Sequence, residues 1–315
     1  MYDNVRVINL KQNRGKANAL KFGVMAARGE IIVTLDSDAV LEHDALHWLV
    51  GHFVRSGGER VGAVTGNPRV RNRSSLLAKV QLVEYSSIIG LIKRSQRVLG
   101  KVMTVSGVIV AFRKRALLDC GLWDVDLITD DIGVTWKLQR RFWDIRYEPK
   151  ALCWMFVPET ISGLWKQRVR WAQGGIEVLM RHWKIIFDWR HRRFVPVLLE
   201  QLVSIVWSIC WFISTILLVI EMVLSHHYYV PVFWTGTYLA LVSVIQSFVA
   251  LYLDRLYEPG LMKYFMWSIW YPSIYWYVNA LVVLRAIPKA ISHMNAVKKG
   301  NKYAVWDSPD RGIVS

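Results

Sequence analysis

Two carboxylates, Asp36 and Asp38, follow an apolar stretch and are separated by a single serine. The segment Gly29–Ala39 reads Gly-Glu-Ile-Ile-Val-Thr-Leu-Asp-Ser-Asp-Ala, and its β-branched run predicts a strand buried on both faces, as in a parallel sheet. Ligands of such sheets bind beyond the carboxyl ends of the strands, where these aspartates lie. Their hard oxygen atoms suit Mg²⁺ or Mn²⁺, and such an ion could hold a substrate's phosphates. A turn in which Ser37 or Asp38 caps the next helix explains the same residues without a metal.

A second acidic pair, Asp130 and Asp131, follows Thr129 at the predicted start of a helix that runs to about Phe142. Thr129 suits the N-cap and the helix dipole favours acids in a first turn, so the pair has a purely structural explanation. A carboxylate there could instead act as a general base, because it can take a proton from a sugar hydroxyl within hydrogen-bond reach. The residues alone leave both roles open.

The segment Gly163–Trp183 mixes Trp, Arg, Lys and Leu at helical spacing, which is typical of a helix that lies in a membrane interface. Within it, Gln167, Arg170 and Trp171 lie at positions i, i+3 and i+4, so one helix face presents an amide, a guanidinium and an indole. Arginine can clamp a diphosphate through paired hydrogen bonds, and tryptophan can stack on a sugar ring. An amphipathic interface helix anchored by Trp and Arg is the alternative.

Lys16, Ser106 and Gly107 occupy further positions at which a ligand could be bound. Lys16 lies at the predicted N-terminus of a helix and could contact a phosphate, although a solvated lysine is the simpler interpretation. Ser106 and Gly107 fall inside a predicted strand, Thr104–Phe112, where a glycine often marks the close approach of a ligand or backbone. Glu84 lies in an apolar segment of helical period and is interpreted as a polar position on a helix surface.

Strands and helices alternate through the first half of the chain, which predicts an α/β domain with a parallel sheet. Besides the strand that ends at Leu35, the expected strands are Val5–Leu10, Val61–Thr65 and Thr104–Phe112. The expected helices are a segment ending near Ala27, then Asp44–Val54, Ser74–Leu91 and the helix that opens at Thr129.

The composition points to a membrane protein in the second half. Hydrophobic residues make up 53% of the 315 residues and 16 residues are Trp, which is high for a soluble enzyme. The net charge of +16 is not accompanied by a nucleic-acid-binding motif, so no nucleic acid is expected as a partner. Lysines and arginines beside membrane spans fit anionic lipid headgroups better.

Three apolar segments are long enough to cross a membrane. They are Phe194–Ile220, Val232–Leu253 and Tyr264–Leu284, the last interrupted by Pro272. The loop Glu221–Pro231 has no Lys or Arg, whereas the flank before Phe194 carries Arg190, Arg192 and Arg193, so the soluble domain is expected in the cytoplasm. The tail after the third segment is also basic, and that segment could instead be re-entrant or interfacial.

Taken in order, these motifs resemble a processive family 2 glycosyltransferase of the type that makes cellulose, chitin and hyaluronan. The resemblance covers nearly the whole chain, and Gln-x-x-Arg-Trp after an acidic helix start is its specific element. The matching motifs are Asn13-Arg14-Gly15-Lys16-Ala17-Asn18, Asp36-Ser37-Asp38, Ser106-Gly107, Thr129-Asp130-Asp131 (the family usually has Thr-Glu-Asp) and Gln167-Arg168-Val169-Arg170-Trp171. The segments Asp-Ser-Asp-Ala-Val-Leu, Tyr257–Gly260 and Ser308–Gly312 most resemble members that make a bacterial biofilm polysaccharide of N-acetylglucosamine.

The resemblance implies a GT-A type nucleotide-sugar-binding domain followed by transmembrane α-helices, and it assigns roles to the motif residues. Asp38 with Asp36 would bind Mg²⁺ or Mn²⁺ at the donor's diphosphate, and Asp131, beside Asp130, would be the general base of an inverting transfer. Donor contacts are implied for Lys16, Asp36, Gln167, Arg168 and Arg170. Acceptor contacts are implied for Trp171, Ser106 and Gly107.

The same resemblance implies the substrates, the location and the division of the chain. The donor would be UDP-N-acetylglucosamine and the product poly-β-1,6-N-acetylglucosamine, made by a multi-pass protein of the bacterial inner membrane. A small membrane partner and regulation by cyclic di-GMP are implied as well. The expected parts are a partial GT-A domain (1–160), interface helices with the Gln-Arg-Trp motif (161–193), a transmembrane region of about three segments (194–287) and a basic tail (288–315).

The resemblance departs from the family at the start of the chain, which begins at what would be the third strand. Family members have two earlier strands, an aspartate for the uracil and preceding membrane helices. We therefore expect a sheet without its first strands and poor binding of UDP-sugar by this chain alone. Another polysaccharide synthase, a lipid-linked sugar transferase and a non-catalytic membrane partner or channel are the alternative functions; the acidic pairs and Gln-Arg-Trp favour the synthase.

Overall fold

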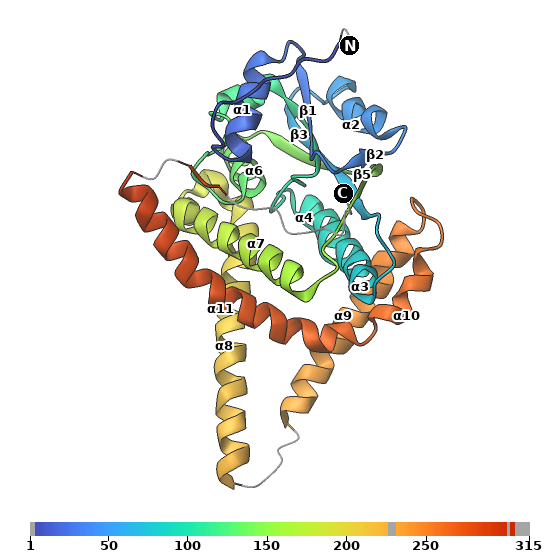
Figure 1. Ribbon diagram of the computed structural model, residues 1–315, viewed down its shortest axis with the longest axis vertical. Coiled ribbons are helices and arrows are strands. Elements are labelled where there is room, and N and C mark those ends of the chain that lie inside the picture. Colours follow the sequence, from blue (N-terminus) through green and yellow to red (C-terminus); the bar gives the residue numbers. More distant parts are fainter. Residues whose placement is uncertain (1–3, 226–230, 301–302, 306–315) are drawn as a thin grey trace.

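The α/β domain is followed by long helices, two of which extend away from it (Figure 1). The structure is a computed structural model that describes residues 4–225, 231–300 and 303–305. The long helices are α7 (Ile161–His182), α8 (Val195–Ser225), α9 (Pro231–Asp254) and α11 (Tyr271–Lys298). Short helical turns join them: η2 (Trp183–Phe187), η3 (Trp189–Phe194), η4 (Leu261–Tyr264) and α10 (Phe265–Ser268).

The sheet of the α/β domain is mixed, and its described strands follow the order β1-β4-β3-β5-β2. The strands are β1 (Ile31–Leu35), β2 (Val40–Leu41), β3 (Val61–Val70), β4 (Ile109–Arg113) and β5 (Asp144–Met155). Strands β3 and β5 pair in parallel, whereas β4 runs antiparallel to both β1 and β3. The predicted all-parallel sheet is therefore wrong, because β4 starts beside the residue at which β1 ends and runs in the opposite direction.

Two predictions about individual strands are also wrong. Strand β1 is an edge strand in the described sheet, and its last residue, Leu35, is exposed rather than buried on both faces. The segment Val5–Leu10 forms no strand, and Val7 is 87% exposed. A strand needs a hydrogen-bonded neighbour, and no described strand pairs with this segment.

Helices cover both faces of the sheet and bury its apolar side chains. One face packs against α1 (Lys16–Ala26), α5 (Lys114–Asp119) and α6 (Asp130–Arg140), and the other against α2 (Ala45–Val54). In α2, Leu49 and Phe53 lie four residues apart, so both reach the sheet from one helix face. This three-layer packing holds the ends of β1 and β4 beside the start of α6.

The predicted helix Ser74–Leu91 is part of a longer helical run. It comprises α3 (Leu76–Glu84), the π-helical turn η1 (Tyr85–Leu91) and α4 (Ile92–Leu99). Ser75 caps it, because its hydroxyl accepts a 3.2 Å hydrogen bond from the amide of Ala78. π-Helical turns often occur at functional sites, and this one lies beside the cavity described below.

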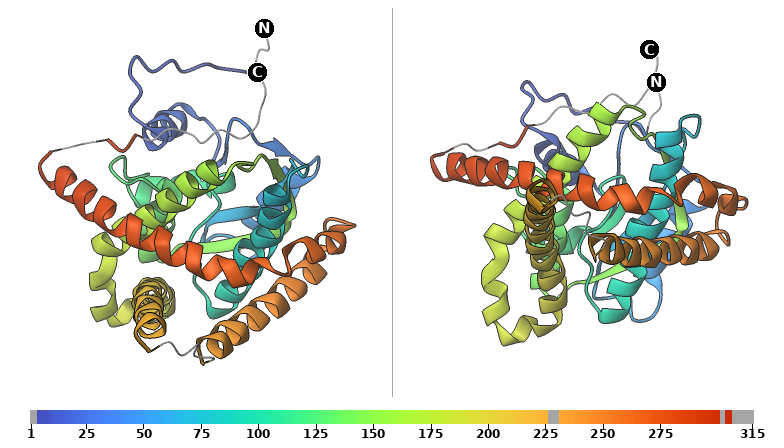
Figure 2. Two further views of the ribbon diagram at one scale, coloured as in Figure 1. Left: turned by 60° about the horizontal axis from the view of Figure 1, so that its bottom comes forward. Right: turned by 90° about the horizontal axis from the view of Figure 1, so that it is seen from below.

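Within the described part of the chain, three helices are long and apolar enough to cross a membrane. They correspond to α8, α9 and α11, and α11 runs beside α7 across the upper end of α8 (Figures 1 and 2). The predicted third segment, Tyr264–Leu284, is misplaced, since α11 begins at Tyr271 and continues to Lys298. Pro272 lies in the first turn of α11, where proline needs no hydrogen-bond partner, and so it does not interrupt the helix.

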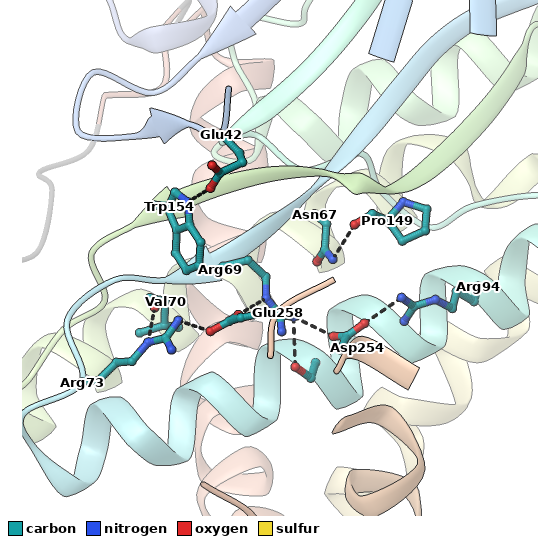
Figure 3. Close-up of polar contacts among 11 residues, drawn as sticks. Glu42, Asn67, Arg69, Val70, Arg73, Arg94, Pro149, Trp154, Asp254 and Glu258 are labelled. Atoms are coloured by element: carbon teal, nitrogen blue, oxygen red, sulfur yellow. Dashed lines mark hydrogen bonds and ion pairs between the residues drawn. The ribbon is translucent and has the colours of Figure 1, made fainter. Parts of the chain in front are cut away.

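A buried ion-pair network attaches the end of α9 to the α/β domain (Figure 3). Arg69, from β3, donates to Asp254 at 2.6 Å and to Glu258 at 2.7 Å. Arg94, from α4, donates to the other oxygen of Asp254 at 2.6 Å. The side chains of Arg69 and Asp254 are at most 2% exposed, so their charges depend on one another for stabilisation.

Helix α7 crosses the start of α6 at a glycine. A Cβ on Gly174 would lie 2.1 Å from Oγ1 and 2.6 Å from Cβ of Thr129, the residue before the second acidic pair. Thr129 occupies the predicted N-cap position, but its hydroxyl is buried at this crossing and makes no capping hydrogen bond among the described residues. Only a glycine lets α7 approach α6 this closely.

We expect Arg69→Met to destabilise the protein by about 3–5 kcal/mol, because Asp254 and Glu258 would stay buried with one cation fewer. The measurement is thermal unfolding of the purified protein in detergent. Asp44→Asn is the matched control, since Asp44 pairs with His43 at the surface, where it is 71% exposed. An unchanged melting temperature for Arg69→Met would contradict the prediction.

Gly174→Ala is expected to lower the melting temperature, because the new methyl group would overlap with Thr129 and separate α7 from α6. Gly23→Ala in α1 is the control: a Cβ there meets no described atom within 4 Å, so it should be neutral or slightly stabilising. Equal melting temperatures for the two variants would rule out the close crossing.

Candidate active site

Lys16 connects the segment after β1 with the turn before β4, where the C-terminal end of β1 lies beside the start of β4. Its ammonium pairs with Asp36, directly after β1, and donates a 3.1 Å hydrogen bond to the backbone oxygen of Gly107. Burial lowers the pKa of Lys16, whereas the carboxylates of Asp130 and Asp36 raise it. The carboxylates together have the larger effect, so the pKa of Lys16 lies above its ordinary value. Lys16 thus lines a cavity instead of pointing into solvent, contrary to the simpler interpretation of its motif.

The antiparallel register of β1 and β4 determines which residues meet at this edge. The last residue of β1 pairs with the first of β4, and the amide of Asp36 donates to the carbonyl of Val108 at 3.2 Å. Ser106 and Gly107 lie in the turn before β4, not inside a strand as predicted for Thr104–Phe112. The turn brings both residues to the carboxyl end of β1.

Asp130 and Asp131 lie at the first turn of α6 and face the same edge. Burial raises the pKa of Asp130 to about 6, although the ammonium of Lys16 opposes this. Asp131 Oδ1 accepts a 2.9 Å hydrogen bond from the amide of Ile132. A Cβ on Gly107 would lie 3.3 Å from Asp131 Oδ2 and 3.5 Å from Lys16 Nζ, so the glycine leaves room for both groups.

Helix α7 adds the amide, guanidinium and indole of its motif to a cavity of about 440 Å³. Gln167 is 2% exposed, and its Oε1 has no hydrogen-bond partner among the residues that the structure describes. Burial lowers the pKa of Arg170, while nearby carboxylates, led by Asp131, raise it. Trp171 lines the same cavity. The motif therefore meets the acids of the sheet edge.

Arg168 is held in the cavity wall by Glu84. Its guanidinium donates to the Glu84 carboxylate at 2.8 Å and lies 4.5 Å from the ring centroid of Trp171. Glu84 is 6% exposed, and burial raises its pKa while Arg168 lowers it, so its interpretation as a surface position is wrong. Its neighbours one turn away, Val80 and Ile88, are apolar, and this is the sequence signal that could have revealed its burial.

The cavity continues from the acids into the space between α4, α8 and α11. Lys93 and Gln96 line it from α4, Glu200 from α8 and Asn279 from α11. Gln96 donates to the Glu200 carboxylate at 2.8 Å. These residues could not be predicted from the sequence, because spacing along one helix does not show which other helices it contacts. One continuous space thus joins the α/β domain to the apolar helices.

The acids after β1 can supply part of a divalent-cation site. Asp36 lines the cavity, whereas Asp38 lies half-buried in the adjoining turn and does not line it. Among the described residues, no three His, Cys, Asp or Glu side chains are grouped for metal binding. Two carboxylates still fit an ion that takes its other ligands from a diphosphate and water, as Mg²⁺ often does.

The chain matches known glycosyltransferases in sequence and in structure. Residues 1–174 match the family described as "Glycosyltransferase like family 2". The poly-beta-1,6-N-acetyl-D-glucosamine synthase of Staphylococcus epidermidis is 45% identical over 98% of this chain and 74% of its own length. The synthase of the same name from Staphylococcus aureus strain COL is also 45% identical, over 97% of this chain and 74% of its own.

A solved structure supports the fold. The mannosyltransferase PcManGT from Pyrobaculum calidifontis, in complex with GDP-Man and Mn²⁺, has a TM-score of 0.55 and 21% identity, covering 87% of this chain and 68% of its own. The expected GT-A type domain, followed by apolar helices, is confirmed. The family match covers more than half of the chain, and the two relatives cover nearly all of it. The chain therefore belongs to glycosyltransferase family 2.

Proposed function

We propose that this glycosyltransferase is a membrane-embedded synthase that transfers N-acetylglucosamine from UDP-N-acetylglucosamine to a growing poly-β-1,6-N-acetylglucosamine chain. The observation that carries the proposal is the continuous cavity, which joins the acids and the Gln-Arg-Trp motif to α8 and α11. A transferase that adds one sugar needs no such extension, whereas a synthase must hold a lengthening product. The sugar and its linkage rest on the relatives that share 45% identity.

In this proposal Asp131 is the general base. Its carboxylate takes the proton of the acceptor hydroxyl as that oxygen bonds to the donor's anomeric carbon from the face opposite the diphosphate. The bond from the anomeric carbon to the diphosphate oxygen breaks, and UDP leaves with inversion. Burial raises the pKa of Asp130, which favours its protonated form and so opposes a second negative charge beside the base.

Cationic and polar groups hold the donor and the acceptor in place. Lys16 and Arg170 offset the charge of the diphosphate, and the side-chain amide N–H of Gln167 can donate to it. The buried amide oxygen of Gln167 can accept a hydrogen bond from a substrate hydroxyl. Trp171 supplies a face on which the terminal sugar can stack. Arg168, held by Glu84, orients Trp171 and can still add to the positive field at the donor.

A divalent cation, Mg²⁺ or Mn²⁺, would be held by Asp36 and Asp38 and would neutralise charge on the leaving diphosphate. Lys16, which pairs with Asp36, would then share that carboxylate with the ion. The basic run Arg190–Arg193 before α8 supports a cytoplasmic catalytic domain at the bacterial inner membrane. The small membrane partner and cyclic di-GMP regulation stay predictions of the family resemblance.

Asp131→Asn is expected to reduce polymer synthesis by about 10²–10⁴-fold, because an amide cannot accept the proton. The substitution is made at the chromosomal locus, and membranes are supplied with UDP-N-acetylglucosamine and Mg²⁺. Asp119→Asn is the control, since Asp119 bonds Trp143 away from the cavity. A wild-type product that is a single-sugar lipid, or no sugar transfer, would overturn the proposed function.

Chelation by EDTA should abolish transfer in wild-type membranes. Added Mg²⁺ or Mn²⁺ should restore it, because the cation again neutralises the negative charge of the leaving diphosphate. Asp38→Asn should raise the Mg²⁺ concentration needed for half-maximal rate, whereas Asp44→Asn, at an exposed aspartate that follows β2, should not. Full activity in EDTA would refute the metal site while leaving the choice of sugar untouched.

A further inference from the structure

Lys93 is a buried lysine in the wall of the catalytic cavity. Its side chain extends from α4 and the residue is 5% exposed. Among the residues described here, it has no hydrogen bond and no carboxylate within ion-pair distance. Buried lysines are almost always paired, so an unpaired one inside an active-site cavity requires an explanation.

The burial of Lys93 carries a cost that the protein alone does not offset. Desolvation lowers the pKa of Lys93 from 10.5 to about 8, and the Asp131 carboxylate only partly opposes this shift. Gln96, one turn along α4, is already engaged, since its side chain bonds both Glu200 and the amide of Met103. The three N–H groups of Lys93 therefore remain for a molecule that enters the cavity.

The other charges of the cavity indicate what kind of molecule that is. The remaining charged side chains in its lining are Lys16, Asp36, Glu84, Asp130, Asp131, Arg168, Arg170 and Glu200. Lys16 and Arg170 lie at the donor's diphosphate in the proposed function, whereas Lys93 lies where the cavity continues between α4 and α8. Glu200 lies on this side, and the charge of Asp131 also acts on Lys93, so an anion here would be repelled by both carboxylates. A neutral ligand rich in oxygen atoms, such as a sugar, fits the space.

We propose that Lys93 is an acceptor-binding residue, which donates hydrogen bonds to hydroxyl or acetamide oxygens of the terminal sugar and so positions its reacting hydroxyl beside Asp131. The proposal rests on the proposed function, because it needs a sugar acceptor. It assigns a role to a residue outside the Gln-Arg-Trp and acidic motifs. A structural lysine would instead stabilise the fold through a protein partner.

This role predicts a pH dependence with a definite sign. The ammonium form of Lys93 is present below about pH 8 and is lost as the pH rises through that value, so the rate of transfer should fall there. In Lys93→Arg the guanidinium stays charged at higher pH, and the fall should move upward. In Lys93→Met the rate should be low throughout and this fall should disappear.

The experiment compares Lys93→Met, Lys93→Arg and wild type, introduced at the chromosomal locus, in membranes supplied with UDP-N-acetylglucosamine. Initial rate, KM for the donor and polymer length are measured from pH 6 to 10, and thermal unfolding is measured on purified protein. Lys101→Met is the matched control, since burial also lowers the pKa of Lys101 but this residue does not line the cavity.

We expect Lys93→Met to lower the maximal rate about tenfold or more and to shorten the polymer, with the donor KM unchanged, because a charged hydrogen bond to the acceptor is lost. Its melting temperature should equal or exceed that of wild type, because a costly buried charge is gone. Wild-type rates and pH profile in Lys93→Met would overturn the proposal, and so would a joint loss of activity and thermal stability. Absence of polymer in wild type itself would instead count against the proposed function.

Discussion

The repulsion between carboxylates that share one cavity is the constraint on which the site depends. Asp36 comes from the end of β1, and Asp130 and Asp131 from the start of α6. In a partly buried cavity their negative charges repel one another and oppose folding, so nearby cations must compensate them. Lys16 and Arg170 converge from α1 and α7, and burial raises the pKa of Asp130 to about 6, so that this acid is protonated more readily than an exposed one. In the proposed function the same cations are then available to a diphosphate, so the charge balance that permits folding would also prepare the donor site.

A second buried network joins the end of α9 to the α/β domain and to the helix α4 that lines the cavity. Arg69 and Arg94 hold Asp254 at the end of α9, and α4, which carries Arg94, also carries Lys93 and Gln96 into the cavity. Helix α7 packs on α6 at Gly174 and on α11 along its apolar face. In the proposed function, a product that leaves the acids would meet walls whose positions are set by these contacts.

Much of the fold and most of the motif residues could be predicted from the sequence. Periodicity located α2, α7, α8 and α9 closely, and Lys16, Asp36, Asp131 and Gln167 all line one cavity. The direction of β4 could not be predicted, because an apolar strand has the same pattern in either direction. The burial of Glu84 was not predicted for a related reason. Its partner Arg168 lies 84 residues away in the chain, and local spacing carries no information about such a pair.

The sequence by itself determined the chemistry, because residue type and order specify which groups are acids, cations and stacking surfaces, and runs of apolar residues specify helices that suit a membrane. Only the tertiary structure decided how these groups are combined. It brought the turn at Ser106 and Gly107 to the end of β1, paired Arg168 with Glu84, and left Lys93 buried and unpaired beside Asp131. These outcomes depend on packing between distant segments, where burial sets the energy of each charge, and burial is a property of the folded chain.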